Sequence, residues 1–277
     1  MATSANVPKS LSDLVKLTAR HGKKALLISA ADSGADRLPA GKVAIDISKV
    51  ATLQEIVTEK NRVVVGSGVL LGRLVREAIG ENGLIRQAAS LIANPLVRNR
   101  VSLMDALDPD SPYFDITTPL ALLDSKIRLQ SPGGKRTIPI MEFLDSSGKG
   151  LKKGEIPIGI EFTKLPSTDR VGFFRVARMG GRGSVAAAAR MRMVKGKCLD
   201  PEIFVSSLTL IPLRSKAAEQ EISGKDTSET SIKRASKLAA DEIGEMAEKH
   251  NAYEHTLIEI TVARTLRSIM DSTGTGV

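Results

Sequence analysis

The sequence predicts an α+β fold in three parts, and three features of its hydrophobic pattern support this. Short apolar runs typical of strands recur from Lys24 to Ile211. Amphipathic stretches with helical spacing lie between several of them. From Thr227 onward only helical spacing is found. This order predicts two α/β parts that enclose a cleft, followed by a part in which a small antiparallel sheet packs against two long helices.

The first part is expected over residues 1–52 as a small α/β unit. Apolar residues at helical spacing predict a helix over Ser10–His21, which Gly22 ends. Apolar runs predict strands at Lys24–Ala30 and Val43–Ile47. A polar loop over residues 31–36 separates the two strands.

The second part is expected over residues 53–166. Its hairpin signal is Ser131-Pro132-Gly133-Gly134, between two strand-like runs. Asn94-Pro95 is expected to end a helix, because the residue before proline avoids helical geometry. Strands are predicted at Arg62–Ser67, Lys126–Gln130, Arg136–Ile140 and Ile156–Phe162, and helices over 70–79, 84–92 and 115–123.

The third part is expected over residues 167–277, after the linker-like Pro166–Asp169. Its strands are predicted at Val171–Arg178, Val185–Met193 and Ile203–Ile211. The alanine run within the second of these would also permit a helix. Apolar stripes that begin at Ile232 and at Leu257 predict the two long helices.

Composition excludes several classes of protein. The chain has 277 residues, a net charge of +9 and an aromatic content of only 3% without Trp. A base-stacking platform is therefore disfavoured, and no nucleic-acid partner is expected. No apolar run reaches the roughly 20 residues that span a bilayer, and Met1–Ser10 lacks a signal-peptide pattern. One cysteine, Cys198, forbids a disulfide within the chain, so a cytoplasmic protein is expected.

Residues for independent catalysis are not evident in the sequence. The histidines are His21, His250 and His255, and the last two are not spaced for one helical face. No metal-binding spacing, nucleophile elbow or phosphate-binding Walker loop is present. If the chain serves an enzyme, a cofactor or a partner subunit is expected to supply the chemistry.

Several local sequences, taken in order, carry a family resemblance from about Lys24 to about Met270. The main ones are Leu91-Ile92-Ala93-Asn94-Pro95 with Val97-Arg98-Asn99, Pro132–Pro139 with Glu142-Phe143, Lys153–Ile156, Phe174-Arg175-Val176, Leu210–Arg214 with Ala217-Ala218-Glu219, and the helix after Tyr253. Their order and spacing resemble the flavoprotein (medium) subunit of the molybdenum hydroxylases, such as carbon monoxide dehydrogenase and xanthine dehydrogenase.

The resemblance implies a fold, an activity and partners. The fold would be a two-part α/β cleft of the FAD-binding (PCMH-like) type with a C-terminal domain of the CO dehydrogenase flavoprotein type. The activity would be the transfer of electrons from [2Fe–2S] clusters through FAD to an external acceptor. An iron–sulfur small subunit and a large subunit with the molybdenum cofactor would be the partners, in a dimer of heterotrimers. The single cysteine agrees with metal ligands on those other chains.

The resemblance also implies cofactor-binding residues on two loops and three further segments. The first loop supplies Ala30, Ala31, Asp32, Ser33 and Gly34, and the second supplies Ser102, Met104, Asp105 and Ala106. Asp115 is the acidic residue downstream of the second loop, Ile156 lies on the strand expected against the flavin, and Arg175 is the basic residue of its segment.

Both loops lack the paired glycines that the family uses to present bare backbone amides to a pyrophosphate. Ala30 and Ala31 replace the first pair, and Met104 and Asp105 replace the second. Two interpretations follow. In one, FAD is held by altered contacts from Ser33, Gly34, Ser102 and the loop amides. In the other, the fold persists without flavin and serves a structural role in assembly of the complex.

Overall fold

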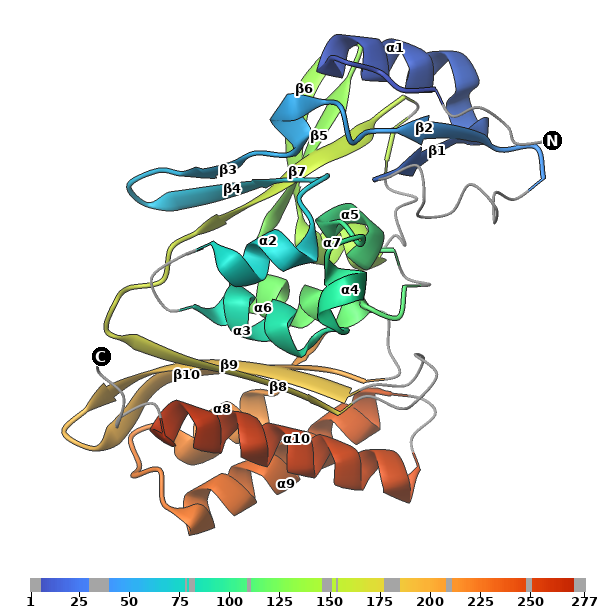
Figure 1. The fold of residues 1–277 in the computed structure, drawn as a ribbon. Coiled ribbons are helices and arrows are strands. Elements are labelled where there is room, and N and C mark those ends of the chain that lie inside the picture. The colour runs from blue at the N-terminus through green and yellow to red at the C-terminus, as the bar shows by residue number, and fades with distance from the viewer. Residues whose placement is uncertain are drawn as a thin grey trace. The chain divides into compact units, whose positions relative to one another are not determined.

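The computed structural model describes residues 6–29, 40–77, 79, 83–108, 111–145, 151–152, 154–176, 185–207, 211–247 and 251–271 (Figure 1). The chain divides into two compact units. The first comprises Met1–Glu77, Ala93–Ser111 and Asp124–Thr163, and the second comprises Ala78–Ile92, Pro112–Leu123 and Lys164–Val277. Two stretches of the expected middle part therefore cluster with the C-terminal residues. The boundaries near residues 52 and 166 stay predictions.

The first unit begins with α1 (Leu11–His21), which packs on two parallel strands, β1 (Ala25–Ile28) and β2 (Val43–Asp46). The Ser10 hydroxyl caps the start of the helix by accepting a hydrogen bond from the amide of Asp13. Gly22 ends the helix with a φ of 54°. The expected helix and both strands are confirmed. The apolar core beneath the helix is formed by Leu14, Val15, Ile45, Ile47, Val50, Leu53, Ile156 and Ile158.

The first unit also contains a five-stranded antiparallel sheet, in the order β3-β4-β7-β5-β6. The predicted hairpin is confirmed, because β5 and β6 pair from Ser131–Gly134 back to Lys126–Pro139. The strands are β3 (Ile56–Thr58), β4 (Arg62–Gly66), β5 (Lys126–Ser131), β6 (Gly134–Pro139) and β7 (Ile156–Thr163).

Short helices complete the first unit: α2 (Leu71–Arg76), α4 (Pro95–Arg98), α5 (Leu103–Ala106) and α7 (Ile140–Asp145), with 3-10 turns at Gly22–Lys24 and Ala51–Leu53. The Asn94-Pro95 pair starts a helix as well as following one. The Asn94 side chain accepts the Val97 amide, and proline occupies the first helical position.

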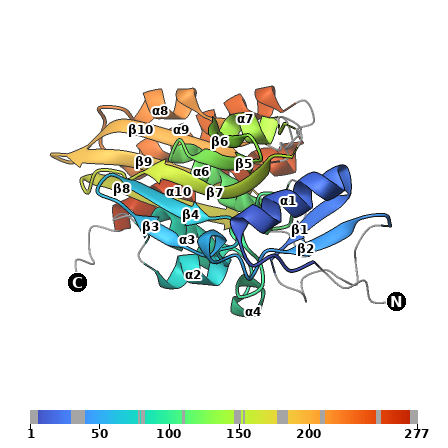
Figure 2. The same cartoon turned by 90° about the horizontal axis from the view of Figure 1, so that it is seen from above.

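The second unit is a four-stranded antiparallel sheet, in the order β11-β10-β9-β8, with helices on both faces. Helices α8, α9 and α10 lie along one face (Figure 1), and seen from above they underlie the strands (Figure 2). Helix α3 contacts β8, and α6 contacts β9 and β10. The elements are α3 (Leu84–Leu91), a 3-10 turn at Phe114–Ile116, α6 (Thr117–Leu122), β8 (Asp169–Val176), β9 (Val185–Val194), β10 (Lys197–Ser206), β11 (Leu213–Arg214), α8 (Lys216–Ile222), α9 (Glu229–Met246) and α10 (Ala252–Asp271).

Strand β9 carries the alanine run, which forms a strand and not a helix. Ala187 and Ala189 belong to the core cluster formed with α8, α9 and α10, and Ala186 and Ala188 alternate to the opposite face. All four are fully buried. Strand β10 begins at Lys197, earlier than the expected Ile203, and the end of that expectation, residues 208–210, lies outside the described residues. No helix of the described chain is both long and apolar enough to cross a membrane.

Candidate functional site

The segment expected to form the second cofactor loop is the short helix α5. Ser102 is its N-cap, and Asp105 is the third residue of the helix. The two form a reciprocal capping box. The Asp105 amide donates to the Ser102 hydroxyl at 3.2 Å, and the Asp105 carboxylate accepts the Ser102 amide at 2.8 Å and its hydroxyl at 2.8 Å. The sequence Ser-x-x-Asp is itself a capping-box signal, so this arrangement could have been predicted.

Every backbone amide from Ser102 to Leu107 donates within the chain. Two of these bonds join α5 to the segment that follows β4, because Leu103 donates to the carbonyl of Val69 and Met104 to that of Ser67. The amides of Ser102 and Asp105 are those of the capping box. The amides of Ala106 and Leu107 donate to the carbonyls of Ser102 and Met104. The described structure therefore leaves no amide of this segment for a bound anion.

The Asp105 carboxylate also contacts the residue that precedes the first loop. The hydroxyl of Ser29, directly after β1, donates to Asp105 Oδ2 at 2.5 Å. Both Ser29 and Ser102 are buried. We call Ser29, Ser102 and Asp105 the Asp105 cluster. All five residues expected in the first loop lie outside the described residues: Ala30, Ala31, Asp32, Ser33 and Gly34.

The Arg98-Asn99 turn fixes where α5 begins. Arg98 donates from Nη1 to the carbonyl of Ala93, which has a positive φ of 55°. Asn99 Oδ1 accepts a hydrogen bond from Arg76 at 3.2 Å and packs closely on Gly72, so a Cβ at Gly72 would force the Asn99 side chain to move. The segment is also tied to α2, because the amide of Leu71 donates a hydrogen bond to the carbonyl of Val101. These contacts hold the start of α5 in one register.

Asp115 and Arg175 are brought together within the second unit. Their ion pair measures 2.6 Å between Oδ2 and Nη2, and only 8% and 10% of the two side chains are exposed. Arg175 Nη1 also donates to the carbonyl of Leu91 at the end of α3. The ion pair thus joins the 3-10 turn before α6 to β8. The hydrogen bond from Arg175 Nη1 joins β8 to α3.

The remaining expected residues have structural positions in the first unit. The Ile156 side chain is buried in the core under α1. Met104 is half-buried on α5, and Ala106 is fully buried at its end. The assignment of these residues to cofactor binding stays a prediction. Ser29 was not expected to take part, because its partner lies 76 residues further along the chain.

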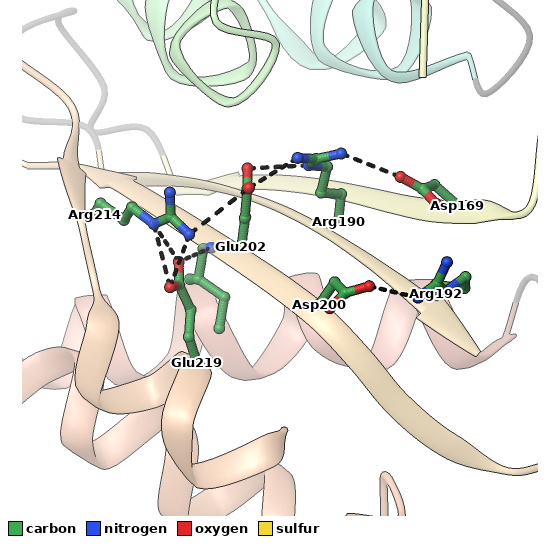
Figure 3. A network of polar contacts seen from close by, with 8 residues as sticks. Asp169, Arg190, Arg192, Asp200, Glu202, Arg214 and Glu219 are labelled. Carbon is green, nitrogen blue, oxygen red and sulfur yellow. Dashed lines mark hydrogen bonds and ion pairs between the residues drawn. The ribbon is translucent and has the colours of Figure 1, made fainter. Parts of the chain in front are cut away.

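A network of charged residues covers part of the sheet in the second unit (Figure 3). Arg190 on β9 pairs with Asp169 on β8 at 3.2 Å and with Glu202 on β10 at 2.8 Å. Arg214 pairs with Glu219, whose carboxylate also accepts the amide of Ile203. The hydrogen bonds that Arg190 donates to Glu202 raise the pKa of Arg190, and those that Arg214 donates to Glu219 raise the pKa of Arg214. Each cation here is matched by carboxylates, so the network is a structural feature of the sheet.

Neither a metal site nor a reactive thiol is present in the described part of the chain. No group of three histidine, cysteine or acidic residues could hold a metal ion among the described residues. Cys198 is fully buried, and burial raises the pKa of its thiol to about 12. Metal and thiol chemistry by the described residues is therefore unsupported.

Comparison with known proteins places these features in a family. The model described as "FAD binding domain in molybdopterin dehydrogenase" matches residues 2–164. The chain is similar to the 6-hydroxypseudooxynicotine dehydrogenase complex subunit alpha of Paenarthrobacter nicotinovorans, with 24% identity over 94% of this chain and 93% of the relative. It is also similar to the carbon monoxide dehydrogenase medium chain of Hydrogenophaga pseudoflava, with 25% identity over 84% of each.

Solved structures show the same fold. A chain of quinoline 2-oxidoreductase from Pseudomonas putida 86 superposes with a TM-score of 0.85 at 21% identity, covering 99% of each chain. A chain of carbon monoxide dehydrogenase from Hydrogenophaga pseudoflava superposes with a TM-score of 0.82 at 23% identity, covering 98% of each. The expected α+β fold class is confirmed. With the family model matching more than half of its length, this chain belongs to the family of FAD-binding domains in molybdopterin dehydrogenases.

Proposed function

We propose that this chain is the medium-type subunit of a multi-subunit, molybdenum-hydroxylase-like oxidoreductase. The proposal is supported by family membership and by relatives that are named as subunits or chains of dehydrogenases and that align along most of this chain. An iron–sulfur small subunit and a molybdenum-binding large subunit are the proposed partners, in a dimer of heterotrimers in the cytoplasm. The chemistry at the substrate belongs to those partners.

Two roles are possible for such a subunit, and they differ in FAD. In the electron-transfer role, FAD would take electrons from the [2Fe–2S] clusters and pass them to an external acceptor. That role requires the chain to hold a doubly charged pyrophosphate. A pyrophosphate site in a loop is built from backbone amides that approach closely and donate to the phosphate oxygens.

The described residues of the second loop do not fit a pyrophosphate. All amides from Ser102 to Leu107 already donate within the chain. The Asp105 side chain adds a carboxylate to the segment, and that carboxylate accepts the hydroxyls of Ser29 and Ser102. Two unit charges of the same sign about 4 Å apart repel by roughly 1 to 4 kcal/mol, depending on the local dielectric. A phosphate at this segment would therefore be repelled by the carboxylate and would find no free backbone amide to donate to it.

The geometry favours the second role, in which the subunit carries no flavin and acts in assembly of the complex. The observation that carries this choice is the Asp105 cluster. Its carboxylate accepts three hydrogen bonds, two from Ser102 and one from Ser29, and so engages the donors that these two residues supply. A half-buried carboxylate satisfied in this way stabilises the turn without any bound ligand.

The test is an inventory of the intact complex. The chain carries an affinity tag in its native cells, and the complex is purified and assayed for iron, molybdenum and acid-released flavin. Iron and molybdenum on two further subunits, without flavin, would support both the subunit assignment and the structural role. One FAD per copy of this chain would contradict the structural role only. A chain that purifies alone, without iron or molybdenum, would contradict the subunit assignment.

A further inference from the structure

A groove lies between α1 and the turn of the β5–β6 hairpin, and no residue of the Asp105 cluster lines it. Its volume is about 710 Å³, and it is open to solvent along one side. It lies entirely within the first unit. The lining residues come from α1 and from the hairpin turn: Leu11, Ser12, Val15, Lys16, Ala19, Arg20, Gln130, Ser131, Pro132 and Lys135.

Two parallel rows of side chains on α1 form one wall of the groove. Residues four apart lie on the same face of a helix, so each row follows the helix axis. The first row is apolar and consists of Leu11, Val15 and Ala19. The second row is polar and cationic and consists of Ser12, Lys16 and Arg20. The hairpin supplies the apolar ring of Pro132 and the ammonium of Lys135 on the opposite wall.

The cations of this groove are not matched by carboxylates along its lining. No carboxylate lines the groove, and Lys16, Arg20 and Lys135 form no ion pair among the described residues. Lys16 and Arg20 also repel one another, because like charges four residues apart on a helix are unfavourable. By contrast, Arg136 on the same hairpin pairs with Glu155 at 2.6 Å. The groove therefore holds cations that an anionic partner would neutralise.

We propose that this groove docks an amphipathic helix of another subunit of the complex, with one row of carboxylates and one row of apolar side chains at four-residue spacing. The proposal rests on the proposed function, since that complex provides the partner. The two rows on α1 determine the four-residue spacing expected in the partner helix, and the cations require that its charged row be negative. The volume accommodates side chains rather than a whole helix, so the partner helix lies over the groove and inserts one face. A nucleic acid fits poorly, because half of the α1 wall is apolar and no aromatic residue lines the groove.

The test reverses the charges of the groove in the tagged complex. In one variant, Lys16→Glu, Arg20→Glu and Lys135→Glu are combined. The matched control combines Lys233→Glu, Arg234→Glu and Lys237→Glu, which line a separate groove of about 490 Å³ on α9 and α10. The control makes the same change in net charge on exposed helix residues. Circular dichroism and the Tm confirm that both variants are folded.

We expect the groove variant to weaken association with the other subunits by about tenfold or more, and the control to leave it unchanged. Equal weakening in both variants would show a general effect of net charge and would overturn the proposal. Unchanged association in the groove variant would also overturn it while leaving the proposed function intact. If the wild-type chain itself does not associate with other subunits, the proposed function fails instead.

A cross-link identifies what occupies the groove. Ala19→Cys is labelled with a maleimide photo-cross-linker; Cys198 is fully buried and its thiol pKa is raised to about 12, so labelling is confined to residue 19. The expected product joins residue 19 to a helical segment of another subunit whose acidic residues recur every four positions. A product with a second copy of this chain, with a basic segment, or with no protein in the intact complex would contradict the proposal.

Discussion

The hydroxyl of Ser29 donates to the carboxylate of Asp105 at 2.5 Å across 76 residues of sequence. The same oxygen accepts the amide and the hydroxyl of Ser102. One carboxylate oxygen thus joins the end of β1 to the start of α5. Such a charge-assisted cluster is stronger than neutral hydrogen bonds, and its loss would leave buried donors unsatisfied.

We expect Asp105→Ala to lower the free energy of unfolding by about 1 to 3 kcal/mol, because a helix cap and two buried hydroxyls lose their acceptor. Ser29→Ala should cost about 1 kcal/mol, since it removes only one of the three bonds. Urea unfolding followed by circular dichroism measures both. Asp145→Ala, at the exposed end of α7, is the control and should stay within about 0.5 kcal/mol of wild type. An Asp105→Ala variant as stable as wild type would show that the cluster is dispensable.

Restoring glycine should improve flavin binding if the Asp105 cluster is what excludes FAD. We expect Met104→Gly combined with Asp105→Gly to raise the affinity for FAD by about tenfold or more, because a carboxylate and two side chains are removed. Quenching of flavin fluorescence during a titration measures the change. Met104→Gly alone separates steric bulk from charge, since it keeps the carboxylate. No gain in the double variant would mean that another feature excludes the flavin.

The Asp115–Arg175 pair should be costly to break from one side. Arg175→Met leaves a carboxylate buried without its cation, and we expect a loss of about 3 to 5 kcal/mol in the free energy of unfolding. Asp115→Leu combined with Arg175→Met removes both charges and should cost less than the sum of the single variants. Additive effects in this double-mutant cycle would show that the 2.6 Å contact contributes little energy.

Gly172 lies where β8 packs tightly against α10. A Cβ there would lie 2.6 Å from the carbonyl oxygen of Thr265 and 2.7 Å from the hydroxyl of Ser268. We expect Gly172→Ala to destabilise the second unit by about 1 to 3 kcal/mol through overpacking. Gly133→Ala in the hairpin turn is the matched control, because its nearest neighbour would be 3.7 Å away. A lower Tm for Gly172→Ala but not for Gly133→Ala would confirm the close packing.

The thiol of Cys198 should be unreactive in the native protein. Full burial and a pKa raised to about 12 predict almost no thiolate at pH 8. Ellman's reagent should therefore react at a normal rate only after the protein is unfolded in guanidinium chloride. Rapid reaction of the folded protein at pH 8 would contradict the buried environment of this residue.

Helices and strands could be predicted from the sequence where the local signals and the tertiary packing favour the same structure. Helix α1 was predicted because Ser10, its apolar stripe and Gly22 all indicate the same boundaries. Strand β3 escaped prediction because it is short and its side chains are largely exposed, so no alternation is visible. Helix α8 escaped because Glu219, on its inner face, is buried by contacts with Ile203 and Arg214 that no local pattern reveals.

The candidate site was predictable in part for the same reason. The replacement of glycine at Met104 and Asp105 could be read directly, and the Ser102–Asp105 capping box has a sequence signal. The partnership with Ser29 could not be read, because it depends on how β1 and α5 are placed in three dimensions. The Asp115–Arg175 pair was expected as two separate cofactor contacts, and only the fold shows that the two side chains contact each other.

The alternation of alanines along β9 gives the second unit a built-in set of reporters. Ala187 and Ala189 face the long C-terminal helices, whereas Ala186 and Ala188 face the other layer, which contains α6. Methyl-labelled alanine would thus place nuclear magnetic resonance probes a single residue apart in adjacent but separate hydrophobic layers. A change in the packing of either layer would be visible as a larger shift in one pair of methyl signals than in the other.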